Sequence, residues 1–130
     1  RTPLPALLPQ VDVLSLHCLL TDTTRNMIGA KELDLLPAGA FLINTARGGL
    51  VDEAALAKAL QSGKLGGAAT DVLSQEPPVN GNVLLDLDLP NLIITPHCAW
   101  ASREARQRLI NLTASNIRHF IDGTLKRYVV

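Results

Sequence analysis

Four groups of polar residues follow short apolar runs in this 130-residue chain, and each holds side chains that can bind ligands or move protons. Histidine can act as a general acid or base near neutral pH, and a carboxylate beside it favours the imidazolium and orients the ring. The guanidinium of arginine suits bidentate binding of a carboxylate. The four groups are His17-Cys18, the segment 44–49 with Arg47, Asp71 with Glu76, and Pro96-His97.

Each of these residues also has an ordinary structural interpretation. Arg47 could bridge a neighbouring acid at the surface, because loop arginines are common. His97 could be a partly buried or exposed loop histidine, and Glu76 an exposed turn carboxylate. Asp71 could cap the turn after its strand or accept a ligand's amide proton. His17, Cys98 and His119 show no C-x-x-C or H-x-x-x-H spacing, so no metal site is expected.

The elements that must position these groups alternate between strands and helices. After an irregular start with at most a helical turn in residues 1–10, short apolar runs predict strands, and capped amphipathic patterns predict helices. The strands are expected at 11–16, 40–46, 66–72 and 91–96, and the helices at 29–36, 53–62 and 103–122. Alternation of this kind indicates βαβ units and a parallel sheet, and ligands bind beyond the carboxyl ends of such strands.

Local signals fix the helix ends. Asp52 is a candidate N-cap for the middle helix, and Gly63 a candidate C′ residue. Ser102 is the candidate N-cap of the last helix, on which Ile110, Ala114, Ile117 and Ile121 form an apolar stripe. The four aromatic residues, Phe41, Trp100, Phe120 and Tyr128, leave an aliphatic core, which is common in sheets buried on both faces.

Composition excludes several classes. Lys plus Arg and Asp plus Glu are 12 each, and this zero net charge argues against a nucleic-acid-binding protein. No apolar run reaches about 18 residues, so no membrane partner is expected. The chain starts Arg-Thr-Pro without a signal-peptide pattern, and two cysteines suggest free thiols in a reducing, cytoplasmic setting. Residues 100–130 carry six basic and two acidic residues, which indicates a solvated basic face or a contact with another domain or subunit.

A dinucleotide-binding sheet should carry Gly-x-Gly-x-x-Gly after its first strand. Neither Gly48-Gly49 nor Gly66-Gly67 has that spacing. If the sheet is of the Rossmann type, its phosphate-binding half is therefore expected outside these residues.

Taken together, four segments resemble the D-isomer-specific 2-hydroxyacid dehydrogenases over about residues 11–123. The segments are LHCLLTDTTRNMI, INTARGGLVDEAAL, GAATDVLSQEPP and LIITPHCAWAS. The resemblance implies reduction of small 2-oxo acids to D-2-hydroxy acids with NAD or NADP as cofactor, in homodimers whose active site lies between two domains. It also implies that residues 1–130 are the C-terminal half of the nucleotide-binding domain, an α/β fold with half of a Rossmann-type parallel sheet, plus a long final helix.

The resemblance assigns roles residue by residue. His97 would be the acid/base, Glu76 its partner, and Arg47 the group that binds the substrate carboxylate and polarises the carbonyl. On the cofactor side, Asp71 would accept from the nicotinamide carboxamide. The residues near the nicotinamide would be Thr45, Ala46 and, through its backbone, Ala99. Cys18 and Thr24 would lie near the adenosine and the phosphates. Leu19 stands where the family usually has proline, which frees a backbone N–H in the loop under the cofactor.

Trp100 narrows the choice of substrate. His-x-Ala-Trp-Ala-Ser is similar to glycerate dehydrogenases, which reduce hydroxypyruvate and glyoxylate, and an indole beside the histidine would favour small 2-oxo acids. Trp100 could instead only pack at the start of the last helix. The motif also resembles corepressors of the C-terminal-binding-protein type, so a nucleotide-sensing interaction protein is the alternative. The 130 residues by themselves are expected to be inactive.

Overall fold

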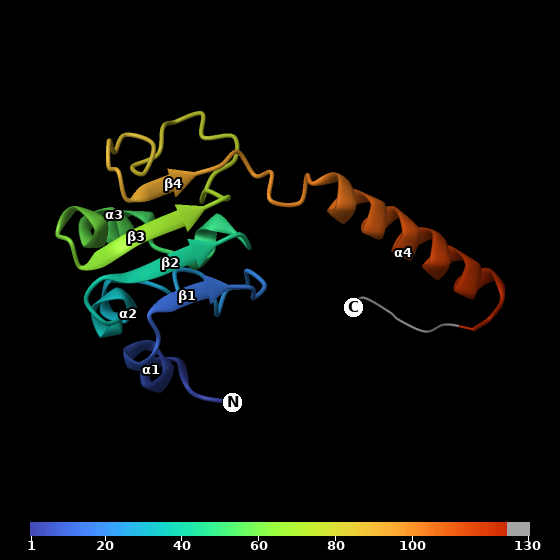
Figure 1. Ribbon diagram of the computed structural model, residues 1–130, viewed down its shortest axis with the longest axis horizontal. Coiled ribbons are helices and arrows are strands. Elements are labelled where there is room, and N and C mark those ends of the chain that lie inside the picture. Colours follow the sequence, from blue (N-terminus) through green and yellow to red (C-terminus); the bar gives the residue numbers. More distant parts are fainter. Residues whose placement is uncertain (125–130) are drawn as a thin grey trace. The chain divides into compact units, whose positions relative to one another are not determined.

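The computed structural model describes residues 1–124 and divides into two units, Arg1–His97 and the part that begins at Cys98 (Figure 1). Tyr128, one of the four aromatic residues, lies outside the described residues, as do Lys126 and Arg127. The first unit holds a four-stranded sheet, and the second holds one long helix. Each unit is described by itself.

All four strands of the first unit are parallel, in the order β1-β2-β3-β4. This confirms the parallel sheet that the alternating pattern predicts. Each strand lies inside its expected run or within one residue of it; the first strand ends at Leu16 as predicted, and the other three end two residues earlier, where polar residues begin. The strands are β1 (Val13–Leu16), β2 (Ala40–Asn44), β3 (Leu65–Thr70) and β4 (Leu92–Ile94).

The predicted helices are present with the predicted caps. Asp52 accepts a hydrogen bond from the Ala55 amide at 3.0 Å, and Gly63 adopts φ +73°, a left-handed conformation that suits glycine after a helix. The helices are α1 (Leu4–Leu7), α2 (Ala30–Leu35), α3 (Glu53–Gln61) and α4 (Arg103–Ile121), with short 3₁₀ turns at Leu8–Gln10 and Gly48–Leu50.

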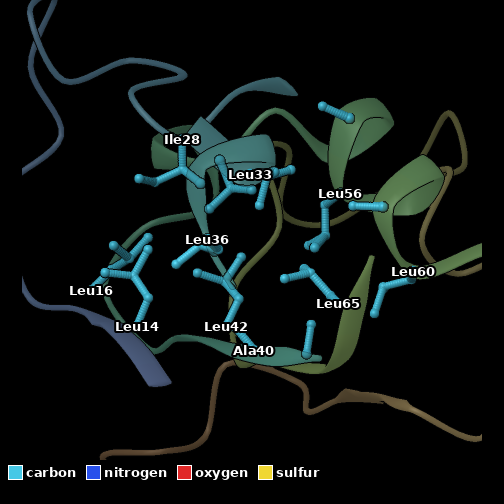
Figure 2. Close-up of a cluster of buried hydrophobic side chains, with 14 of the residues drawn as sticks. Leu14, Leu16, Ile28, Leu33, Leu36, Ala40, Leu42, Leu56, Leu60 and Leu65 are labelled. Carbon is cyan, nitrogen blue, oxygen red and sulfur yellow. The ribbon is translucent and has the colours of Figure 1, made fainter. Parts of the chain in front are cut away.

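The core lies between one face of the sheet and the helices α2 and α3 (Figure 2). Leu14, Leu42 and Leu65 face it from three strands, and Leu33 and Leu56 face it from the two helices. Each of these leucines is at most 7% exposed, and burying such a side chain contributes about 1.5–3 kcal/mol. This aliphatic core is the one that the scarcity of aromatics predicts.

The other face of the sheet is apolar but exposed, so the expectation of burial on both faces holds for one face only. Val13 is 53% exposed, Phe41 50% and Ile93 61%, and they surround an open hollow of about 350 Å³. Gly66 and Gly67 form the floor beside Phe41. Strands alternate their side chains between faces, so this surface follows directly from the register that fills the core.

The helix α4 begins at Ser102, whose hydroxyl accepts from the Ala105 amide at 3.1 Å as predicted. The predicted stripe is exposed, with Ile110 at 61%, Ile117 at 57% and Ile121 at 75%. No helix among residues 1–124 is both long and apolar enough to cross a membrane.

Candidate functional site

The carboxyl ends of the four strands meet at one edge of the sheet. The register pairs Leu16 with Asn44, Asn44 with Thr70, and Thr70 with Ile94, which places these four residues in a single row. The polar groups picked out in the sequence follow this row on all four strands. The strand register therefore brings polar side chains from segments far apart in the chain to one edge of the sheet, as expected for an open parallel sheet.

His97 and Glu76 form a direct pair at this edge. The Nδ1 atom of His97 lies 2.7 Å from Oε2 of Glu76, and the side chains are 42% and 34% exposed. The other carboxylate oxygen of Glu76 accepts from the Leu73 amide at 2.8 Å. One oxygen thus fixes the carboxylate to its own loop and the second orients the imidazole, so Nε2 is the ring nitrogen through which His97 can exchange a proton with a ligand.

The backbone of His97 is itself in an uncommon conformation. Its φ is +52°, and its amide donates to the Thr95 carbonyl at 3.0 Å. A left-handed conformation costs a non-glycine residue on the order of 1 kcal/mol, and such residues cluster at functional sites. The turn at Pro96 and the bond to Glu76 stabilise His97 in this conformation and offset the cost of its left-handed backbone.

An open hollow of about 660 Å³ lies beside the pair. Its wall is apolar apart from His97, Glu76 and Thr95, and comes from the 73–85 segment and from β4 with the turn after it. Ligand sites typically combine an apolar wall with a few polar groups in this way. The hollow gives the His97–Glu76 pair a surface on which a small molecule can lie.

Arg47 lies on the turn after β2, and Asn44 shapes that turn. The Asn44 side chain is 2% exposed, its Nδ2 donates to the Arg47 carbonyl at 2.9 Å, and its Oδ1 accepts from the Ala46 amide at 3.1 Å. The exposed Arg47 guanidinium donates to the Ala46 carbonyl at 2.7 Å, a bond within its own turn. Thr45 is exposed and Ala46 half-buried on the same turn.

Asp71 follows β3 and is 4% exposed. Its Oδ1 accepts from the Thr95 hydroxyl at 2.5 Å, and its amide donates to the Asn44 carbonyl at 2.9 Å. The side chain is therefore tied to the residue that follows β4, and the backbone to the last residue of β2. This fixes a carboxylate directly after Thr70 of the strand-end row, where it can accept hydrogen bonds.

The loop after β1 carries Cys18 and Thr24. Thr24 donates to the Leu19 carbonyl at 2.7 Å and accepts from the Thr21 amide at 2.8 Å, and the Cys18 thiol lies 3.6 Å from the sulfur of Met27. Leu19 is 79% exposed. The Asn26 amide donates to the Gly49 carbonyl at 2.8 Å, so this loop is attached to the turn that carries Arg47.

Ala99 and Trp100 belong to the second unit, and Trp100 is 60% exposed. Both cysteines, Cys18 and Cys98, are reduced and exposed. Among residues 1–124 no group of three or more His, Cys, Asp or Glu side chains is arranged to hold a metal ion.

Three residues that position this site have no assigned role in the sequence-based interpretation: Asn44, Thr95 and Glu53. Asn44 could have been found, because it continues the buried phase of Ala40 and Leu42 along β2, and a polar side chain in that phase needs partners. Thr95 and Glu53 could not have been found from the local sequence, because their hydrogen-bond partners are distant in the chain. Thr95 donates to Asp71, 24 residues away, and Glu53 accepts from Ser74, 21 residues away.

Comparison with known proteins gives consistent matches. The sequence model described as "D-isomer specific 2-hydroxyacid dehydrogenase, NAD binding domain" matches residues 1–99. A protein named glycerate dehydrogenase from Methylorubrum extorquens is 57% identical over 120 residues, which are 92% of this chain and 38% of that protein. A glyoxylate reductase from Aeropyrum pernix is 44% identical over 117 residues, which are 90% and 34% of the two chains.

A solved structure shares the fold. The D-isomer specific 2-hydroxyacid dehydrogenase from Lactobacillus delbrueckii ssp. bulgaricus, in an NAD-complexed form, superposes with a TM-score of 0.82 at 34% identity. The match covers 99% of this chain and 42% of that one. The present chain therefore spans about two fifths of the proteins it matches.

Proposed function

The chain belongs to the D-isomer-specific 2-hydroxyacid dehydrogenases, and on this basis we propose that it supplies the acid–base half of an NAD(P)-dependent reductase of small 2-oxo acids. The observation that carries the proposal is the 2.7 Å contact between His97 Nδ1 and Glu76 at the carboxyl edge of the sheet. The names of the relatives, glycerate dehydrogenase and glyoxylate reductase, favour hydroxypyruvate and glyoxylate as substrates.

In this proposal each residue has one task. Glu76 holds the imidazolium of His97, and His97 Nε2 gives its proton to the carbonyl oxygen of the 2-oxo acid as C2 is reduced. Arg47 binds the substrate carboxylate through its guanidinium and polarises the carbonyl. The products are the 2-hydroxy acid and neutral His97, which takes up a proton from water before the next turnover.

The strand-end row suits the nicotinamide end of the cofactor. Asp71 offers a buried carboxylate, held by Thr95, which can accept from a carboxamide N–H. Thr45 and Ala46 on the neighbouring turn and the backbone of Ala99 are the proposed nicotinamide contacts, and Cys18 and Thr24 lie on the loop proposed for the adenosine and phosphate side. When bound, the reduced nicotinamide supplies the hydride. These 130 residues contain no Gly-x-Gly-x-x-Gly, so we expect other residues to bind the pyrophosphate.

We propose that residues 1–130 act as the C-terminal half of a nucleotide-binding domain plus its final helix, inside a longer subunit. Relatives more than twice as long support this proposal. The same resemblance favours a homodimer, and the zero net charge, the short apolar runs and the two free cysteines favour a cytoplasmic protein without nucleic-acid or membrane partners. Light scattering of the full-length protein tests the dimer, and a mass equal to one subunit would contradict it.

Replacing His97 tests the function directly. In the full-length protein, His97→Ala should lower kcat/KM for hydroxypyruvate or glyoxylate by about 10²–10⁴-fold, because a positioned general acid contributes that much. Arg47→Lys should raise KM for the 2-oxo acid, since an ammonium cannot reproduce the guanidinium fork. Near-normal turnover by His97→Ala would overturn the assignment.

Nucleotide-dependent partner binding without turnover would favour the corepressor-like function suggested by the Trp100 motif.

A further inference from the structure

The loop that carries Glu76 is held by a second carboxylate that the reaction does not use. Glu53, the first residue of α3, accepts from the Ser74 amide at 2.7 Å and from the Ser74 hydroxyl at 2.6 Å. It also accepts from Asn82 Nδ2 at 2.8 Å. One carboxylate thus joins two points of the loop, on either side of Glu76 and its prolines.

The bonds reach the acid–base pair through two consecutive amides. The Ser74 amide donates to Glu53, and the preceding amide, that of Leu73, donates to Glu76. The two peptide groups meet at the Cα of Leu73, so the bond to Glu53 restricts the position of the Leu73 amide. Glu76 presents one oxygen to Leu73 and the other to His97, and Glu53 holds the adjacent peptide group.

The same peptide group also packs against a glycine of the core unit. A Cβ atom on Gly48 would overlap the carbonyl of Leu73 and the nitrogen of Ser74, so the turn after β2 is in direct contact with this peptide plane. Asn82 connects the far end of the loop to the core, because its Oδ1 accepts from the amide of Leu84, a residue that is 1% exposed. The loop is therefore fixed to the rigid core at both ends of the 74–82 segment.

We propose that Glu53 is a positioning residue for the reaction: it orients Glu76, and through Glu76 the imidazole of His97. The proposal rests on the proposed function, in which His97 transfers the proton. Glu53 acts through other residues and contacts neither substrate nor cofactor in this scheme. Its usual interpretation, a favourable charge in the first turn of α3, explains none of the three bonds to the loop.

Four variants separate positioning from simple stability. Glu53→Ala removes all three acceptor contacts, whereas Glu53→Gln keeps a carbonyl oxygen for the Ser74 amide. Asn82→Ala removes one contact and leaves the rest. The matched control is Glu32→Ala, because Glu32 accepts from the Gly29 amide at 3.1 Å at the start of α2 and so does a similar task away from the loop.

The first measurement needs no turnover. The side-chain ¹⁵N resonances of His97 in this chain report whether Nδ1 is hydrogen-bonded to Glu76, and Glu76→Ala gives the reference without that bond. Glu53→Ala should move the Nδ1 resonance toward this reference. Glu53→Gln and Asn82→Ala should give smaller shifts, and Glu32→Ala none. If Glu53→Ala does not fold, as urea unfolding would reveal, the Gln and Asn82 variants decide in its place.

The second measurement uses the full-length protein. Glu53→Ala should lower kcat by about 10- to 100-fold with KM for the 2-oxo acid unchanged, because a displacement of about an ångström at a reacting group costs up to ~10²-fold. Glu53→Gln should recover part of the rate. Unshifted His97 resonances with an unchanged kcat would overturn the role of Glu53. Absence of turnover in the wild type would overturn the proposed function but leave the resonance test valid.

Discussion

Three polar side chains in the described chain are buried, Asn44, Thr70 and Asp71, and all three lie at the ends of neighbouring strands. Each has hydrogen-bond partners: Asn44 holds the Arg47 turn, Thr70 donates to the Val72 carbonyl at 2.6 Å, and Asp71 accepts from Thr95. Buried polar groups are costly unless they are satisfied. Their concentration at one edge indicates that this edge is built to hold backbone turns in fixed shapes.

Replacing Asn44 tests this at a single residue. Asn44→Ala leaves the Ala46 amide and the Arg47 carbonyl without their side-chain partners, so the free energy of unfolding should fall by about 1–3 kcal/mol. In the full-length protein, KM for the proposed 2-oxo acid substrate should rise because the turn that carries Arg47 is no longer fixed. Urea unfolding and steady-state kinetics measure the two effects. Asn116→Ala, at an exposed asparagine of α4, should lower neither stability nor affinity, and an unchanged KM in Asn44→Ala would contradict the explanation.

At the scale of elements, the site depends on the contact between the turn after β2 and the loop after β3. Gly48 lies directly against the peptide group of residues 73 and 74, where no side chain fits. The two segments carry Arg47 and Glu76. Their separation is therefore fixed by backbone packing and not by the flexible side chains themselves.

Adding one methyl group at this contact has a definite expected result. Gly48→Ala should lower the free energy of unfolding by about 1–3 kcal/mol or more, because the new Cβ meets backbone atoms that cannot rotate away. Gly29→Ala is the matched control: its Cβ would lie 3.4 Å from the Glu32 carboxylate, an ordinary contact. Urea denaturation compares the two, and equal losses would contradict the steric explanation.

At the scale of the whole molecule, the first unit has one covered and one exposed apolar sheet face. Leu14 and Val13 are neighbours on β1, yet Leu14 is 7% exposed and Val13 is 53% exposed. The helices α2 and α3 cover only the face to which Leu14 belongs. The stability of this unit therefore depends almost entirely on that one face.

These two neighbours give a paired prediction. Leu14→Ala should lower the free energy of unfolding by about 2–5 kcal/mol, because it leaves a cavity in the core. Val13→Thr, which is nearly isosteric and lies on the open face, should change it by less than about 0.5 kcal/mol. Thr in place of Val should also reduce the binding of a hydrophobic dye such as ANS to the native chain. Comparable losses of stability in both variants would show that the open face is covered in solution.

Caps, breakers and apolar runs act over a few residues, so the helices, the strands and the order of the motifs could be predicted from the sequence. Asp52, Gly63 and Ser102 end or begin helices as predicted, and the polar groups follow the strands as predicted. The resemblance paired Glu76 with His97, and the two side chains are in contact.

How these motifs meet depends on long-range contacts that the sequence pattern does not show. The strand register places Leu16, Asn44, Thr70 and Ile94 in one row, and Glu53 reaches a loop 21 to 29 residues away. The exposure of Phe41 and Ile93 depends on which face the helices cover. Such contacts join residues that are distant in the chain, and their geometry is set by the packing of the core, so no pattern local to the sequence carries them.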